Sequence, residues 1–252
     1  MEKNSSLRSL PPSSIDSSGS ERLGAWTILA ALGIIPVAIA GVSFGYLLIW
    51  AMYGRIDPHH IGVPALLTTQ LFGYLFLAPY VLAVTTALLR RSLADLGFRT
   101  PSVGQIATAL LGAGAMIIVV TSLAQVVQYA AHVHHEQQAV EIFRTIHDRG
   151  IALYFALVVA IAAPLVEELA FRIFIFNAVR RVANFWIAAP VSGALFALAH
   201  ADPFLFIPLT AGGMILCYVY VRTGNAWMSM ITHACFNGFT LVVLFAVPKG
   251  AF

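Results

Sequence analysis

The stretch that decides the fold is Gly150-Ile-Ala-Leu-Tyr-Phe-Ala-Leu-Val-Val-Ala-Ile-Ala-Ala-Pro-Leu-Val-Glu167-Glu168-Leu-Ala-Phe-Arg172. Its first part, residues 150–166, contains no Asp, Glu, Lys or Arg. A helix that crosses the hydrocarbon core of a bilayer needs about 20 predominantly apolar residues. The run therefore predicts a membrane-spanning helix over about 151–179. Three charged side chains, Glu167, Glu168 and Arg172, lie inside that helix.

Charge-free runs of the same kind cover most of the 252 residues. The chain is 60% hydrophobic and 10% charged, whereas an ordinary soluble protein carries about 25% charged residues. This composition excludes a soluble globular enzyme and a disordered chain. A membrane β-barrel needs alternating segments of about 10 residues, and these runs are continuous and longer. We therefore predict an all-α, polytopic bundle of about seven transmembrane helices, numbered in chain order: 24–53, 63–89, 103–131, 151–179, 184–200, 203–221 and 226–247.

The composition changes along the chain and predicts three parts. Residues 1–22 are rich in serine with scattered charges, which is typical of a disordered polar tail. Residues 23–149 hold helices 1 to 3 and a polar loop. Residues 150–248 hold helices 4 to 7, which carry polar and charged side chains within their apolar runs.

Basic residues near the helix ends predict the orientation of the bundle. With the N-terminus inside, the inner segments hold nine Lys and Arg residues and the outer segments hold four; inner loops of membrane proteins carry the excess. We expect an integral protein of the plasma membrane with its N-terminus inside. The net charge is +3, and no basic cluster is present that would bind nucleic acid.

The polar loop 132–150 has the pattern of an amphipathic surface helix. We expect Val140, Phe143 and Ile146 to face the membrane. The loop is rich in histidine at 132–135, and other histidines fall in outer loops. We interpret these histidines as solvated side chains rather than as a metal-binding rim.

The informative residues are polar groups inside the apolar helices. A charged side chain at the bilayer centre costs about 2.5–3.5 kcal/mol, so such groups face one another or a cavity. Glu168 and Arg172 are four residues apart and share a helix face, whereas Glu167 is turned from Glu168 by about 100°. His200 ends helix 5, and helix 7 carries His233-Ala-Cys-Phe-Asn237. We expect these groups to converge in a membrane cavity formed by helices 4, 5 and 7.

This set of residues favours hydrolysis by an activated water. The chain lacks a Gly-x-Ser-Gly nucleophile, a pair of Asp residues inside helices and a complete His-Glu-x-x-His motif. Glu167 has the chemistry of a general base, and His and Asn donors stabilise an oxyanion. Glu167, His200 and His233 would also suit a catalytic zinc ion with an open position. Both mechanisms stay open, and so does the need for any cofactor.

Three motifs resemble those of the CPBP family of membrane proteins, also called the Abi or type II CAAX-protease family. They are EExxxR at Glu167–Arg172, FxxxH at Phe196–His200 and HxxxN at His233–Asn237. The stretch Tyr220–Trp227 is also similar to the family's link before the third motif. The resemblance covers about 150–247, which we expect to be a CPBP-like catalytic core.

The resemblance implies an intramembrane endopeptidase that acts on membrane-associated, in some members prenylated, protein or peptide substrates. It implies that Glu167 and His200 activate the water and that His233 and Asn237 form the oxyanion site. It also implies supporting residues around them: Glu168, Arg172 and Phe196. Two other hypotheses remain. One is a non-catalytic scaffold or bacteriocin-immunity factor of the same family, and the other is a proton- or metal-coupled transporter.

The expected depths of His200 and His233 in the membrane conflict with straight helices that run perpendicular to the bilayer. His200 lies roughly 25 Å along helix 5 from its inner end, whereas His233 lies only roughly 10 Å into helix 7, at 1.5 Å per residue. We therefore expect helix 5 to be tilted or to start deep in the membrane, with Pro190 as the point of adjustment.

Overall fold

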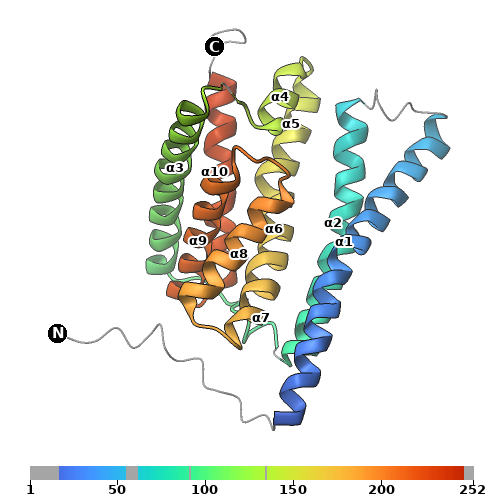
Figure 1. Cartoon of the computed structure of the whole chain (residues 1–252). Coiled ribbons are helices and arrows are strands. Elements are labelled where there is room, and N and C mark those ends of the chain that lie inside the picture. Colours follow the sequence, from blue (N-terminus) through green and yellow to red (C-terminus); the bar gives the residue numbers. More distant parts are fainter. Residues whose placement is uncertain (1–16, 55–61, 91, 134, 247–252) are drawn as a thin grey trace.

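The computed structural model describes residues 17–54, 62–90, 92–133 and 135–246. Every regular element among them is a helix (Figure 1). The α-helices are α1 Ser17–Tyr53, α2 Val63–Leu89, α3 Val103–Ala131, α4 Gln138–Thr145, α5 Arg149–Leu157, α6 Ala163–Glu168, α7 Asn177–Arg180, α8 Phe185–Ala199, α9 Phe206–Thr223 and α10 Ala226–Ala246. Two π-helical segments, η3 Val158–Ala162 and η4 Leu169–Phe176, join α5, α6 and α7 into one continuous rod.

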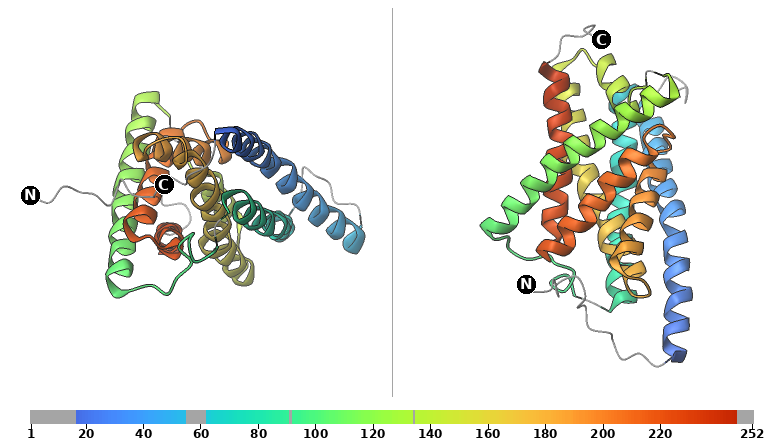
Figure 2. Two further views of the ribbon diagram at one scale, coloured as in Figure 1. Left: turned by 90° about the horizontal axis from the view of Figure 1, so that it is seen from below. Right: turned by 60° about the vertical axis from the view of Figure 1, so that its left-hand side comes forward.

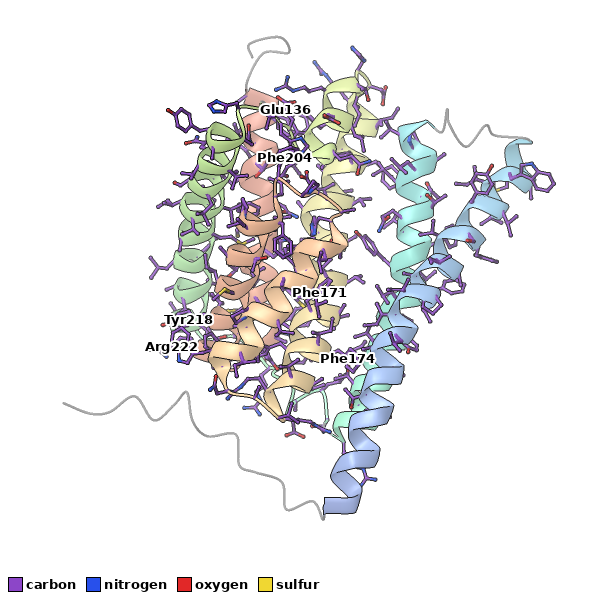
Figure 3. All side chains as sticks on the ribbon, viewed as in Figure 1. Glu136, Phe171, Phe174, Phe204, Tyr218 and Arg222 are labelled. Carbon is purple, nitrogen blue, oxygen red and sulfur yellow. The ribbon has the colours of Figure 1, made fainter. Side chains whose placement is uncertain are left out.

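The polytopic helical bundle is confirmed. Six described helical stretches are long and apolar enough to cross a membrane, and α8 is a shorter apolar helix. The protein is therefore an integral membrane protein. Figure 3 shows Glu136 toward one end of the bundle and Arg222 toward the opposite end, with Phe171 between them. Charged side chains thus lie beyond both ends of an apolar middle, as a spanning bundle requires.

The helix bounds agree with the predicted ones within a few residues, except at the N-terminus. The first helix begins at Ser17, so residues 17–22 belong to α1 and not to a disordered tail. Residues 1–16, the rest of that predicted tail, lie outside the described residues. The serine-rich composition predicted these residues wrongly. A helix that extends beyond an apolar run can include polar residues that form no apolar face.

Helix α1 lies at the edge of the molecule. It packs along α2, and both views of Figure 2 show it at the periphery. Its outer side chains, such as Ile35, Leu47 and Trp50, are exposed. Exposed apolar side chains on a spanning helix are the surface that lipid covers. α2 in turn packs against the rod formed by α5 to η4.

The polar loop forms the expected short helix, α4, but its apolar side chains do not face the membrane. Phe143 and Ile146 are buried, with 5% and 6% of their surface exposed. They pack in a cluster with Leu67, Phe155 and Leu241 from α2, α5 and α10. The expectation was wrong because three helix ends meet under α4 and offer apolar partners that a sequence pattern does not reveal.

The loop after α2 docks onto the turn between α9 and α10. The backbone N–H of Ala226 donates to the carbonyl of Gly97 at 2.9 Å, and Asn225 Nδ2 donates to the carbonyl of Arg99 at 3.0 Å. The hydroxyl of Tyr220 donates to the carbonyl of Leu96, also at 3.0 Å. These bonds tie the N-terminal helices to the C-terminal four.

Helices α8 and α9 cross in close contact through glycine. A Cβ at Gly193 would lie 2.5 Å from the carbonyl oxygen of Thr210, and a Cβ at Gly213 would lie 2.6 Å from the Cα of Gly193. Small residues allow the backbones of membrane helices to approach in this way. α8 is inclined across the bundle in Figure 1, as the conflict of motif heights required.

We predict that Gly193→Ala lowers stability by about 1–3 kcal/mol, because the added methyl group overlaps the backbone of α9. The measurement is the thermal unfolding midpoint of the purified protein in detergent. Gly114→Ala is the matched control, since a Cβ at Gly114 on α3 meets nothing within 4 Å. Equal midpoints for the two variants would show that the crossing is looser than described.

Candidate functional site

The first motif lies on a helix with widened turns on both sides. Glu167 and Glu168 end α6, between the π-helical segments η3 and η4. Pro164 stands at the start of α6 and has no N–H to donate to the preceding turn. Single π-helical turns are frequent at functional sites. Here they place two adjacent carboxyl groups in an otherwise apolar helix.

Glu168 and Arg172 form a fully buried ion pair, as their spacing predicted. Arg172 Nη1 lies 3.2 Å from Glu168 Oε1, and both side chains are 0% exposed. The guanidinium group also lies over the ring of Phe196, 4.6 Å from its centroid, and Nη2 donates to the carbonyl of Gly213 at 3.4 Å. One side chain from the first motif thus contacts α8 and α9 together.

His233 connects the two carboxyl groups of the first motif. Its Nδ1 lies 3.1 Å from Glu168 Oε1, and its Nε2 lies 3.8 Å from Glu167 Oε2. Because a carboxylate only accepts hydrogen bonds, Nδ1 donates its proton to Glu168. Glu167 is 22% exposed, whereas His233 is 3% exposed. The accessible carboxyl group therefore lies beside an imidazole that a buried carboxylate holds in place.

Phe196 and His200 extend this arrangement along α8. The Phe196 ring packs edge-on against His233 and against His200, with centroid distances of 5.5 Å and 4.6 Å. His200 Nδ1 bonds to the carbonyl of Phe196 at 2.8 Å, and the His200 side chain is exposed. The structure thus brings Glu167, Glu168 and His233 into direct contact, and it joins His200 to them through the ring of Phe196.

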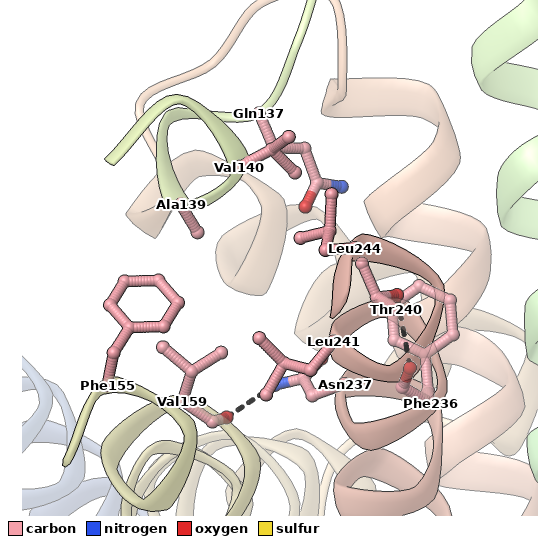
Figure 4. A pocket seen from close by; sticks show the side chains of 10 residues that line it. All are labelled: Gln137, Ala139, Val140, Phe155, Val159, Phe236, Asn237, Thr240, Leu241 and Leu244. Atoms are coloured by element: carbon pink, nitrogen blue, oxygen red, sulfur yellow. Dashed lines mark hydrogen bonds between the residues drawn. The ribbon is translucent and has the colours of Figure 1, made fainter. Parts of the chain in front are cut away.

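Asn237 lies one turn beyond His233 and has a structural partner. Its Nδ2 donates to the carbonyl of Val159 at 2.9 Å (Figure 4). In the π-helical turn the carbonyl of Val158 accepts from Ala163, five residues on. The corresponding donor for Val159 would be Pro164, which has no N–H. Asn237 therefore satisfies a carbonyl group that the proline leaves without a backbone donor.

A small pocket lies next to Asn237 (Figure 4). It lies between the α4 segment, the α5–η3 rod and α10. Most of its lining is aliphatic or aromatic, with three amide or hydroxyl side chains. The lining residues are Gln137, Ala139, Val140, Phe155, Val159, Phe236, Asn237, Thr240, Leu241 and Leu244.

Sequence reasoning missed polar residues that support the motifs. Asn177 Nδ2 donates to the carbonyls of Arg172 and Ile173 in the second π-helical segment, at 3.2 Å and 3.0 Å. On α2, Tyr74 lies near Glu167 and hydrogen-bonds with Gln70. Gln70 and Tyr74 are four residues apart in a charge-free run, and that spacing was an available signal.

The residues considered for zinc do not assemble as a metal site. In the part of the chain that the structure describes, no group of three or more His, Cys, Asp or Glu side chains is placed to hold a metal ion. Glu167 and His233 meet, whereas the recorded contacts of His200 are with Phe196. As placed, these side chains do not fit a zinc ion, and we derive no step through one.

The stretch that carries the three motifs matches the model of a known protein family. Residues 149–239 match the model of the family described as type II CAAX prenyl endopeptidase Rce1-like, and the match contains all three motifs. The match supports the resemblance of the motif region to the CPBP family. Helices 1 to 3 lie outside the match to that family model.

Two curated relatives match part of the chain. The putative membrane peptidase YdiL of Bacillus subtilis (strain 168) is 32% identical over 87 residues, which cover 34% of this chain and 36% of the relative. The membrane-embedded CAAX protease MroQ of Staphylococcus aureus (strain USA300) is 41% identical over 102 residues, covering 38% and 41%. The chain thus spans only about two fifths of the length of these relatives. No solved structure matches the chain.

We predict that Arg172→Met destabilises the protein by about 3–5 kcal/mol, because it leaves the Glu168 carboxylate buried without its ion-pair partner. The double variant Glu168→Gln/Arg172→Met should recover part of this loss, since it buries no charge. Thermal unfolding in detergent measures both.

The control for this prediction is Arg144→Gln, which breaks the partly exposed pair between Arg144 and Glu136. Exposed pairs contribute about 0–1 kcal/mol, so this control should unfold close to the wild type. If Arg172→Met unfolds like Arg144→Gln, the buried pair does not stabilise the bundle.

Proposed function

We propose that this protein is an intramembrane endopeptidase that hydrolyses peptide bonds of membrane-associated proteins or peptides with a water activated by Glu167. The observation that carries the proposal is the contact of Glu167 with His233, whose other ring nitrogen is held by the buried Glu168. An accessible carboxyl group beside an oriented imidazole is the arrangement that general-base catalysis requires. The match of residues 149–239 to the type II CAAX prenyl endopeptidase Rce1-like family model supports the same reaction class.

In the proposed reaction Glu167 Oε2 takes a proton from water while the water oxygen attacks the scissile carbonyl carbon. A tetrahedral intermediate forms with its negative charge on the former carbonyl oxygen. Glu167 then gives the proton to the amide nitrogen as the carbon–nitrogen bond breaks. Nδ1 of His233 is held by Glu168, and Nε2 is the ring nitrogen that the proposal assigns to the oxyanion.

His200 and Asn237 complete the proposed site. Nδ1 of His200 is engaged by the carbonyl of Phe196, so Nε2 is the nitrogen that faces water and substrate. The resemblance assigns His200 to water activation beside Glu167. Asn237 donates one N–H of its amide to Val159, and its second N–H is the donor that the proposal assigns to the oxyanion.

Substrates and membrane location are part of the proposal. A site inside a helical bundle admits peptide segments that lie in or at the bilayer, and tails with a lipid anchor are included. The Staphylococcus aureus relative is named a CAAX protease. We propose the plasma membrane as the location and an inside N-terminus, because basic residues are enriched on the segments that this orientation places inside.

The test compares N-termini of membrane proteins in cells that produce wild-type protein or Glu167→Gln at matched levels. Glutamine keeps the size of the side chain but cannot accept the proton. We expect new N-termini with wild type only. Glu141→Gln, an exposed carboxyl group on α4, is the control and should behave as wild type. Identical N-termini in all three, with all three folded, would favour the scaffold hypothesis.

The cofactor question has its own test. Because the site residues as placed do not fit a zinc ion, we expect the purified protein to cleave its substrate at an unchanged rate after treatment with a strong zinc chelator. Loss of activity that added zinc restores would contradict the metal-free mechanism. The folded state is monitored in parallel by the thermal unfolding midpoint.

A further inference from the structure

A tight polar contact joins two loops near His200. His135 Nε2 lies 2.6 Å from Asp202 Oδ2, and the two side chains are 28% and 13% exposed. His135 belongs to the segment between α3 and α4, and Asp202 to the loop between α8 and α9. Figure 3 shows their neighbours Glu136 and Phe204 toward the same end of the bundle. The contact therefore bridges the N-terminal helices and the loop that begins at His200.

Asp202 organises the loop that follows His200. Its Oδ1 accepts from the backbone N–H of Phe204 at 3.0 Å and from that of Leu205 at 3.3 Å. Ala201, between His200 and Asp202, has a φ of 52°, in the left-handed region. Such a conformation is strained for a residue with a side chain and persists only when its surroundings hold it. Asp202 provides bonds that hold this turn.

The same loop reaches back to the ring beside His200. Leu205 is 5% exposed and belongs to one apolar cluster with Phe196, Ala197 and Leu209. Phe196 is the ring that packs against both His200 and His233. A shift of the loop would therefore move His200 through its backbone and through Phe196.

His135 is itself fixed from two sides. Its backbone N–H donates to Oε1 of Gln128 on α3 at 3.2 Å. Its ring lies over the ring of Phe204, with the centroids 4.8 Å apart. Because the Asp202 carboxylate only accepts, Nε2 of His135 carries the donated proton. Hydrogen bonds to ionised groups are about twice as strong as neutral ones.

We propose that His135 and Asp202 form a positioning pair that holds His200 at the orientation required for peptide hydrolysis. This inference rests on the proposed function. It makes a residue outside the stretch matched by the family model, His135, part of the active machinery. Neither residue touches the reacting atoms; both act through the loop that carries His200.

The test uses two substitutions of His135 in the full-length purified protein. His135→Phe keeps the aromatic contact with Phe204 but removes the donor to Asp202. His135→Gln keeps a donor at about the same reach. Glu136→Gln is the matched control, because it changes the adjacent residue, whose partner is Arg144 and not Asp202. The substrate is a peptide that spans a cleavage site found by the N-terminus comparison.

We expect kcat to fall about 10- to 100-fold in His135→Phe, because a small misplacement of a catalytic group has an effect of this order. KM and the unfolding midpoint should stay near the wild-type values. His135→Gln should recover most of kcat, and Glu136→Gln should match wild type. Backbone hydrogen exchange at Phe204 and Leu205 should speed up in His135→Phe alone.

The outcomes separate this inference from the proposed function. If wild type cleaves and Glu167→Gln does not, but His135→Phe retains full kcat, the positioning pair is overturned while the proposed function stands. If kcat and the unfolding midpoint fall together and His135→Gln recovers neither, the pair acts on stability alone and the inference is overturned. If wild type and Glu167→Gln show the same N-termini, both proposals fall, whatever the exchange rates show.

Discussion

The buried ion pair of Glu168 and Arg172 is the interaction on which the rest of the structure depends. Two unpaired charges in an apolar interior would cost more than a bundle of this size tolerates, so partners must surround them. His233 contacts the carboxylate, and Phe196 and the carbonyl of Gly213 contact the guanidinium group. These contacts fix α8, α9 and α10 relative to the rod that carries the first motif. Buried groups therefore set the position of the accessible Glu167.

The widened turns of the rod also leave polar backbone groups that need partners in the apolar interior. Pro164 and the π-helical segments leave carbonyl groups of the rod without regular backbone donors, and in an apolar interior each needs another partner. Asn237 supplies one donor for Val159, and Asn177 supplies donors at the second segment. Asn237 is thus both a structural partner of the rod and the proposed oxyanion donor. A substitution there affects the shape of the helix as well as the chemistry, so loss of function at Asn237 alone does not demonstrate an oxyanion role.

Sequence reasoning predicted the features that are determined within a single helix. Long apolar runs gave the helical bundle, and the spacing of Glu168 and Arg172 gave their contact. It failed where two elements meet. Phe143 was placed toward lipid because the pattern of α4 shows an apolar side but not the helix ends beneath it. The crossing of α8 and α9 depends on glycine contacts such as Gly193 with Thr210, which a single-helix pattern does not show.

The region matched by the family model contains every motif residue, but contacts from outside this region also support the site. Tyr74 of α2 lies near Glu167, the loop around Gly97 is bonded to the turn before α10, and His135 reaches the loop after His200. Each of these contacts comes from a segment that the family model does not match. Motif residues must meet specific chemical demands, whereas a supporting contact needs only a donor or an apolar side chain at a suitable place. Supporting segments therefore carry little signal in sequence comparison, and their contribution to the site is visible only in the folded bundle.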